Sequence, residues 1–335
     1  MEARRFETTH RALQNGIKVY ESALQGKAED RTVVLEFEHG TMIAIFDGHC
    51  GREAAEFASK NLPQLVAAQF NPAAIDVDQV RVMTQIFEDF DRSLLSKQFR
   101  DGRPAVEKKN IWVISLGDCD AVCGRMQNGK MTPILLSDRH NGSNPKEVER
   151  LLSQHPGEVD VIPYGAVVGV LRVTRALGDH QLKVQSRALA ERILAHFSPS
   201  IVASSTFGIW DRNRNLTPPY ISSTPVVARY DLLPGDILVF ASDGLPDALW
   251  PIPDEETWEV IMALVGGKDD ERLDHRRIQP SLEDNPAELL VKNVLFGADT
   301  TKMANQLVNP ALDDISVVIV DLGWKEIYED LSLHL

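Results

Sequence analysis

Short apolar runs recur along the chain and predict β-strands in three regions. Residues 32–46, TVVLEFEHGTMIAIF, fit two strands joined by a turn at the His-Gly pair. Residues 111–125, IWVISLGDCDAVCGR, fit two more strands around a Gly-Asp turn. The third region is a pair of runs far apart in the sequence, ILVFASDG from Ile237 and DISVVIVDL from Asp314.

Between these regions the apolar residues adopt helical spacing. Residues 51–70 and 77–99 carry apolar side chains three and four positions apart, as expected for helices with one buried face. Two shorter helices, over residues 144–153 and 285–296, have a proline in the first turn, where the missing amide hydrogen is harmless. Strands in some stretches and helices in others favour an α+β fold with antiparallel sheets over a strictly alternating one.

Domain boundaries are not marked by any linker-like stretch. The sequence therefore predicts a single domain over residues 1–335, with its core from about 20 to 322. Residues 198–220 and 251–285 are rich in Pro, Asp, Asn and Arg and are predicted to be loop insertions.

The acidic balance of the chain limits its partners. Its 49 Asp and Glu against 35 Lys and Arg give a formal net charge of −14, which excludes a typical nucleic-acid binder. Such a protein would also repel a phosphorylated substrate, unless bound divalent cations reversed the charge locally.

The cysteines and the apolar runs bear on location. Three cysteines without a Cys-x-x-Cys pair fit neither a disulfide framework nor a zinc site, and favour a reducing intracellular compartment. No apolar run approaches the roughly 18 residues of a membrane span. The first residues have no apolar signal core, and Glu2 and Glu7 interrupt the acid-poor pattern of a mitochondrial transit segment.

The segment FDGHCG, from Phe46 to Gly51, carries the most informative chemistry. An apolar strand ends at Asp47, whose carboxylate can meet a hard cation, and Gly48 lets the backbone carbonyl approach the same ion. His49 titrates near neutral pH, which suits a general acid. Asp-Gly alone is typical of a β-turn, so the longer motif is what favours a site.

Other acidic residues stand in equivalent places at the ends of predicted strands. They are Glu29, Asp30, Asp118, Asp243, Asp313 and Asp314. Each alone fits a solvated turn, but together they predict a site with oxygen ligands only, which suits Mg²⁺ or Mn²⁺ better than zinc. Two such ions can activate a water for phosphoryl displacement.

The ordered set Glu29-Asp30, FDGHCG, LGDCDAV, VTRALGD, ASDGL and DDISVV resembles the protein phosphatase 2C family of metal-dependent serine/threonine phosphatases. Three further stretches resemble its pyruvate dehydrogenase phosphatase branch: HNGSNPKEVERLLSQHPGE from His140, GVLRVTRALGDHQLK from Gly169 and TPPYISSTPVV from Thr217. The resemblance implies two packed antiparallel sheets flanked by helices, with metals in a cleft at one edge. It also makes a phosphorylated protein the substrate, with a pyruvate dehydrogenase subunit as one candidate and mitochondria, besides the cytoplasm, as a candidate location.

The resemblance further implies the residues of the metal site. The ligands would be Glu29, Asp47, the Gly48 carbonyl, Asp243 and Asp313 for two ions, and Asp118 with Asp243 for a third, weaker one. Asp47 would bridge the two principal ions.

Catalytic roles follow from the same resemblance. Asp30 would orient a metal-bound water, Asp47 would hold both ions at the reaction centre, and His49 would protonate the leaving serine or threonine oxygen.

Two departures from the family pattern keep an alternative open. Gln25 stands where the family has an arginine that grips the substrate phosphate. The polar stretch before residue 111, about 99–110, is too short for a core strand that the family has there. These departures favour a catalytically weak or inactive phosphatase-like binding protein as the rival hypothesis. A third interpretation is an unrelated metal-binding α+β protein.

Overall fold

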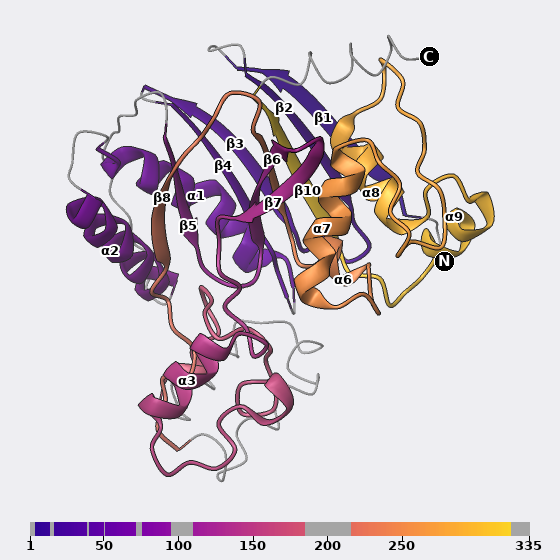
Figure 1. Ribbon diagram of the computed structural model, residues 1–335. Helices are drawn as coiled ribbons and strands as arrows, with labels where there is room; N and C mark the ends of the chain where they lie inside the picture. The colour runs from indigo at the N-terminus through magenta and orange to yellow at the C-terminus, as the bar shows by residue number, and fades with distance from the viewer. Residues whose placement is uncertain are drawn as a thin grey trace.

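The computed structural model describes residues 4–13, 17–38, 40–49, 51–71, 76–94, 110–184 and 216–322. Within these residues the strands form two layers, and helices cover the outer face of each layer (Figure 1). This is the α-β-β-α sandwich that the sequence predicted.

The first layer is a six-stranded antiparallel sheet, called the main sheet below. In spatial order its strands are β1 (Phe6–Ala12), β2 (Lys18–Leu24), β10 (Ile315–Asp321), β9 (Ile237–Ala241), β6 (Asp120–Gln127) and β7 (Lys130–Leu135). The last strand of the described residues thus lies between β2 and β9, at the centre of the sheet.

The second layer consists of two antiparallel ladders. One joins β3 (Arg31–Phe37) to β4 (Gly40–Phe46), and the other joins β5 (Asn110–Ser115) to β8 (Val226–Asp231). Among the described residues no ladder connects the two pairs. The core strand expected to be missing near 99–110 falls almost wholly outside the described residues, and Asn110 already belongs to β5.

The alternation along β10 explains how the layers pack. Ile315, Val317 and Ile319 face a cluster shared with the helices of the outer face. Val318 and Val320 face the second layer. Because successive side chains of a strand point to opposite faces, the run ISVVIVD, buried along its whole length, must be covered on both sides.

Two helix pairs supply the covers. The helices α1 (Glu53–Gln69) and α2 (Asp76–Leu94) pack on the second layer, around Met83 and Phe90. On the main sheet lie α7 (Asp254–Val265) and α8 (Pro286–Leu295). Two shorter helices flank them in the chain: α6 (Gly244–Asp247) precedes α7, and α9 (Thr300–Gln306) follows α8. Among the described residues, no helix is long and apolar enough to cross a membrane.

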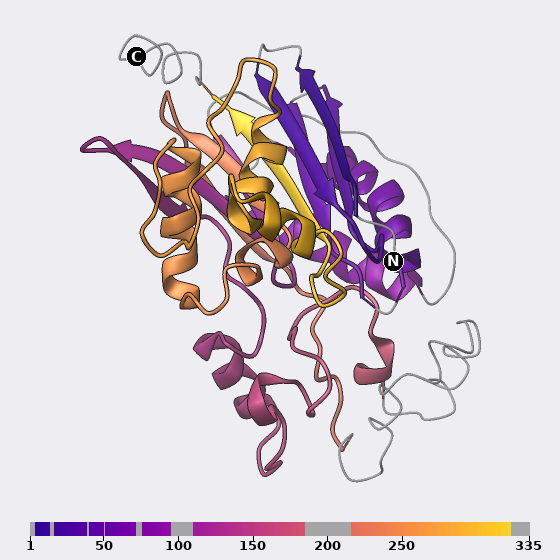
Figure 2. The ribbon, with the colours of Figure 1, turned by 90° about the vertical axis from the view of Figure 1, so that its right-hand side faces the viewer.

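A smaller unit, the α3 lobe (residues 138–184 and 216–224), extends from one end of the sandwich (Figures 1 and 2). It contains α3 (Pro145–Gln154) and the 3-10 turns Pro163–Gly165 and His180–Leu182. Its own small core contains Leu151, Val161, Val167, Val168, Leu182, Tyr220 and Ile221.

Most predicted elements are confirmed within a few residues, but one prediction is wrong. Residues 254–265, expected to belong to a loop insertion, form α7. The helix was missed because its first half is acidic and its second half is apolar on all sides rather than on one face: every residue from Val260 to Val265 is buried. Of the other predicted insertion, residues 198–215 lie outside the described residues.

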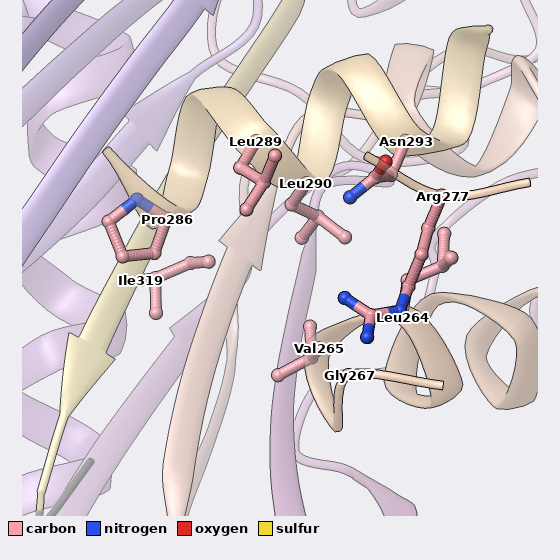
Figure 3. Close-up of a pocket in the computed structure, with 9 residues that line it drawn as sticks. All are labelled: Leu264, Val265, Gly267, Arg277, Pro286, Leu289, Leu290, Asn293 and Ile319. Carbon is pink, nitrogen blue, oxygen red and sulfur yellow. The ribbon is translucent and has the colours of Figure 1, made fainter. Parts of the chain in front are cut away.

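A hollow beside α7 and α8 belongs to helix packing (Figure 3). Its lining is mainly apolar, with Arg277 and Asn293 as polar members, and Ile319 lies near the end of β10 that is remote from Asp313. The Asn293 side-chain oxygen already accepts a hydrogen bond from the Ile278 amide at 2.6 Å. None of the acidic candidates lines this hollow.

Candidate active site

Strand register gathers the acidic candidates at one edge of the sandwich. Leu24 of β2 pairs with Ile315 of β10, and Ala241 of β9 pairs with Val317 on one side and Asp120 on the other. The residues just beyond these pairs are therefore neighbours in space. They are Glu29 and Asp30, Asp313 and Asp314, Asp243, and Asp118.

Asp47 reaches the same edge from the second layer. It follows Phe46, the last residue of β4, which pairs with Arg31 directly after Asp30. Its carboxyl group shares a hydrogen bond with Asp243. Surrounding protein, together with the charges of Asp30, Asp243 and Asp118, raises the pKa of Asp47 far above its ordinary value. The residue still reaches solvent, so an ion can approach it.

Asp30 and Asp243 share this unfavourable environment. Burial, with the neighbouring Asp314 and Asp243, raises the pKa of Asp30 to about 6. Burial and the charges of Asp118 and Asp313 raise the pKa of Asp243 to about 6. The Oδ2 atom of Asp30 is buried and has no hydrogen-bond partner within the described part of the chain. A buried, unpaired carboxylate oxygen is what a cation or a bound water would satisfy.

Asp314 organises the loop that carries Glu29 and Asp30. Its Oδ1 accepts hydrogen bonds from the Gly26 and Lys27 amides at 2.6 and 2.9 Å, and its Oδ2 accepts one from the Glu29 amide at 2.8 Å. Burial alone would raise the pKa of Asp314, but these three amides lower it. A residue from the start of β10 thus fixes a loop that lies far away in sequence.

The turn at Gly48 needs glycine because the backbone of Glu29 lies against it. A Cβ at this position would lie 2.7 Å from the Glu29 carbonyl oxygen. The Glu29 side chain folds back over the same turn, and its Oε1 accepts a hydrogen bond from the Gly51 amide at 2.6 Å. Glu29 and Gly48 are therefore held together, as expected if both served one ion.

His49 contacts a carboxylate from the α3 lobe. Its Nε2 lies 3.1 Å from Oδ1 of Asp179. The Asp179 charge raises the pKa of His49 to about 9, so that the ring holds a proton at neutral pH in the metal-free protein.

The remaining candidates lie at the rim of the cluster. Asp118 accepts a hydrogen bond from the Asn141 side chain at 3.3 Å, and burial raises its pKa. Asp313 is half exposed and pairs with the Lys27 ammonium at 2.7 Å. The Gln25 side chain, in place of the expected arginine, donates to the Asp30 carbonyl at 3.2 Å.

The acidic side chains lie at the same edge of the sandwich, but they are not arranged as a complete ligand shell. Within the described ranges, no three His, Cys, Asp or Glu side chains meet in an arrangement ready to hold a metal ion. Asp30, Asp118 and Asp243 nevertheless lie close enough to Asp47 to raise its pKa, and Asp118 and Asp313 raise the pKa of Asp243. Such a set fits a divalent cation, because the ion would relieve the like-charge repulsion after small side-chain rotations.

Three contacts at this edge were not foreseen from the sequence. They are Asp314 with the Gly26–Glu29 amides, Lys27 with Asp313, and Asp179 with His49. The Asp-Asp pair before β10 was itself a signal for the first, but the partners of Asp314 lie 285 to 288 positions away.

Comparisons with known proteins indicate one family. The family model described as Protein phosphatase 2C matches residues 35–265. A rice protein (Oryza sativa subsp. japonica) named Probable protein phosphatase 2C 36 is 26% identical over 307 residues, covering 86% of this chain and 73% of that protein. The yeast (Saccharomyces cerevisiae) pyruvate dehydrogenase (acetyl-transferring) phosphatase 1, mitochondrial, is 28% identical over 261 residues, covering 65% of this chain and 45% of the yeast protein.

Solved structures support the fold. A phosphatase from a pathogenic strain of Toxoplasma gondii superposes with a TM-score of 0.58 at 16% identity, covering 95% of this chain and 96% of the other. A serine-threonine phosphatase 2C from Toxoplasma gondii gives a TM-score of 0.52 at 17% identity, covering 94% and 99%. At these identities the likeness concerns the arrangement of the elements.

Proposed function

The chain belongs to the protein phosphatase 2C family and is a serine/threonine protein phosphatase, and we propose that the acidic cluster at the sandwich edge carries its reaction with Mg²⁺ or Mn²⁺. The observation behind this proposal is the grouping of Asp30, Asp47 and Asp243: the charge of Asp243 raises the pKa of Asp30, and the charges of both raise the pKa of Asp47. Like charges held close together in a partly buried site are stabilised by protonation or by a bound metal.

Each ligand candidate has a place in this proposal. Two ions would be held by Glu29, Asp47, the Gly48 carbonyl, Asp243 and Asp313, with Asp118 and Asp243 available to a weaker third. Bound divalent cations supply an activated water and screen the charge of the phosphoryl group. Asp47 would face both ions, because the charges of Asp30, Asp243 and Asp118 all act on its carboxyl group.

The chain's own groups complete the chemistry. Asp30, buried with one oxygen free, would accept a hydrogen bond from the attacking water and orient it. His49 would give its proton to the serine or threonine oxygen as the phosphorus–oxygen bond breaks. Both side chains belong to short loops that β3, β4 and β10 hold in place.

A phosphate-release assay tests the proposal. Wild-type protein is incubated with a phosphoserine peptide, with Mn²⁺, with Mg²⁺ and after chelation. Release should require the metal and fall ~100-fold or more in Asp47→Asn, because the variant removes the bridging charge. Asp89→Asn, an exposed carboxylate of α2 at the surface, is the matched control. Metal-independent release, or equal rates for both variants, would contradict the proposal.

The rival function, phosphoprotein binding without turnover, draws on one observation. Gln25 is engaged with the Asp30 carbonyl, and Lys27, a nearby cation, is paired with Asp313. If the wild-type protein binds Mn²⁺ calorimetrically and captures the phosphopeptide, yet releases no phosphate, this function replaces the first.

The substrate proposal rests on the yeast relative. The name of that protein refers to pyruvate dehydrogenase and to mitochondria, and the match covers 45% of the yeast protein. We propose a phosphorylated pyruvate dehydrogenase subunit as the first substrate to test, with mitochondria as the location and the cytoplasm as the alternative. Equal rates on that subunit and on an unrelated phosphoserine protein would remove the substrate preference, and fractionation with an antibody would decide the compartment.

A further inference from the structure

The contact between His49 and Asp179 joins two parts of the molecule that the sequence keeps 130 positions apart. His49 belongs to the turn after β4, and Asp179 belongs to the α3 lobe. The Asp179 side chain is only 8% exposed, whereas the His49 side chain is 42% exposed. A fixed carboxylate therefore holds one nitrogen of a ring that still reaches solvent.

Asp179 is itself held in an uncommon backbone conformation. Its φ is +47°, in the left-handed region, and the preceding Gly178 has φ +81°. Its Oδ1 also accepts a hydrogen bond from the Gln181 side chain at 3.1 Å. Backbone strain of this kind persists where the surrounding contacts enforce it, and it is concentrated at functional sites.

Helix α2 enforces the conformation. Oδ1 of the buried Asp91 accepts from the Gly178 amide at 2.7 Å, and its Oδ2 pairs with the Lys183 ammonium at 2.9 Å. The same ammonium donates to the Ala176 carbonyl at 2.8 Å. Asp91 thus clamps the loop on both sides of Asp179, and the loop presents that carboxylate to His49.

The remaining oxygen of Asp179 argues against a purely structural function. Oδ2 is buried and has no hydrogen-bond partner among the described residues. A carboxylate placed only to stabilise the loop would use both oxygens, because an unpaired buried acceptor costs about 1–3 kcal/mol. Glu147, elsewhere in the lobe, shows the structural arrangement, with both oxygens bonded.

We propose that Asp179 is a positioning residue: it holds the His49 ring through Nε2, so that Nδ1 is the nitrogen that delivers a proton to the leaving serine or threonine oxygen. The proposal rests on the proposed function. In the step itself, the water oxygen bonds to phosphorus, the phosphorus–oxygen bond to the side chain breaks, and the His49 proton passes to that oxygen. The proton lost by the water restores the ring.

Leaving-group dependence tests the proposal, because only a poor leaving group needs the proton. Asp179→Asn is assayed on a phosphoserine peptide and on p-nitrophenyl phosphate, whose phenolate leaves without an acid. We expect kcat on the peptide to fall ~100-fold and kcat on the aryl phosphate to change less than ~3-fold. His49→Gln should show the same selectivity, and the double variant should be no slower than His49→Gln alone, since the residues act as a unit.

Two controls separate positioning from folding. The variant's Mn²⁺ affinity, measured by calorimetry, should stay within ~2-fold of wild type. Asp91→Asn, which loosens the whole loop, should slow both substrates and lower the unfolding temperature. If Asp179→Asn does not fold, the ¹⁵N spectrum of the Mg²⁺-loaded wild type decides: a proton on Nε2 of His49 supports the proposal, and a proton on Nδ1 alone in the neutral ring overturns it.

Equal decreases in kcat on both substrates for Asp179→Asn would overturn the proposal. So would a double variant whose kcat falls by the product of the two single decreases. In either case the wild type would still be a phosphatase. No metal-dependent release by the wild type would instead remove the proposed function. The two failures are therefore distinguishable.

Discussion

Two carboxylate centres of the molecule have opposite electrostatic surroundings: one is paired with arginines, and the other lies among further carboxylates. In the α3 lobe, Glu147 accepts from Arg150, Arg175 and Thr174 at 2.7, 2.6 and 2.6 Å. Burial alone would raise the pKa of Glu147, but these partners lower it far below its ordinary value. At the sandwich edge, Asp47 has mainly other carboxylates as neighbours, and its pKa is raised.

The difference indicates what each centre is for. Glu147 needs nothing from outside, since the chain supplies two guanidinium groups, so its energy serves to hold the lobe together. The like charges around Asp47 repel one another, and under the proposed function this repulsion keeps a cation-binding site prepared. In a metal-dependent enzyme, a cluster that the chain neutralised itself would have no affinity left for the ion.

The largest expected effect is on protein stability, at Glu147. Glu147→Gln leaves two partly buried guanidinium groups without their shared carboxylate, and should lower the unfolding free energy by about 3–5 kcal/mol. Urea unfolding in chelator measures the change. Glu149→Gln, an exposed neighbour on α3, is the control and should change stability by less than about 0.5 kcal/mol. Equal behaviour of the two variants would contradict the assigned structural function of Glu147.

The second effect is the response of the cluster to metal. Mn²⁺ at a hundredfold excess over its dissociation constant should add about 2.7 kcal/mol of stability. At a fixed Mn²⁺ concentration this gain should grow with pH. The pKa values of Asp30 and Asp243 are raised to about 6 each, so the metal-free native state holds protons that the unfolded state has released. The stability of the metal-free protein therefore falls as pH rises from about 4 through about 6.

Thermal unfolding with and without Mn²⁺ at about pH 5 and about pH 8 measures this gain. Potassium chloride at matched ionic strength is the control. A gain that was the same at both pH values would show that the carboxylates of the cluster are not the groups that bind the ion.

The third effect is a gain in stability, opposite to the loss expected for Glu147→Gln, and it is measured by the same urea unfolding. Asp47→Asn removes a repelled carboxyl group and should raise the stability of the metal-free protein by about 1–2 kcal/mol, a figure reduced for the solvent that still reaches the residue. Urea unfolding in chelator measures it, with Asp89→Asn as the control. A loss of stability would mean that Asp47 has a favourable partner in the native protein.

The smallest effect concerns the one cation at the rim that pairs with a candidate ligand in the described structure. Lys27 holds Asp313, and both side chains are about half exposed, 50% and 52%. Lys27→Ala should tighten Mn²⁺ binding up to ~5-fold, because a surface ion pair of up to about 1 kcal/mol no longer competes with the ion. Calorimetry measures it, with Lys60→Ala on α1 as the control. Unchanged or weaker binding would show that the pair does not compete with the metal.

Strongly periodic elements and strand-end carboxylates could be predicted from the sequence, because both are local signals. The run preceding Asp243 and the run following Asp313 identify two central strands, and the acidic residues at their ends indicate the edge. Strands with mixed faces could not be predicted in this way: β1 is exposed along most of its length, and in β2 the buried Glu21 is satisfied by Thr9 and Arg11 of its neighbour.

Contacts between loops also escaped prediction, for a physical reason. A hydrogen bond such as that from the Gly26 amide to Asp314 depends on the register of β2 against β10, which the sequence does not state. The pairing of His49 with Asp179 depends on a left-handed backbone at one residue and on Asp91 of a distant helix. These interactions belong to the assembled fold.

The central place of β10 has a consequence for the order of events during synthesis. The strand that carries Asp313 and Asp314 is the last of the sheet to leave the ribosome, yet it must insert between two strands made earlier. Pairings between such distant segments form late and slowly. A nascent chain that stops short of these residues therefore lacks the tether for its first acidic loop and the proposed ligand Asp313, so the acidic cluster cannot be complete before β10 has been made.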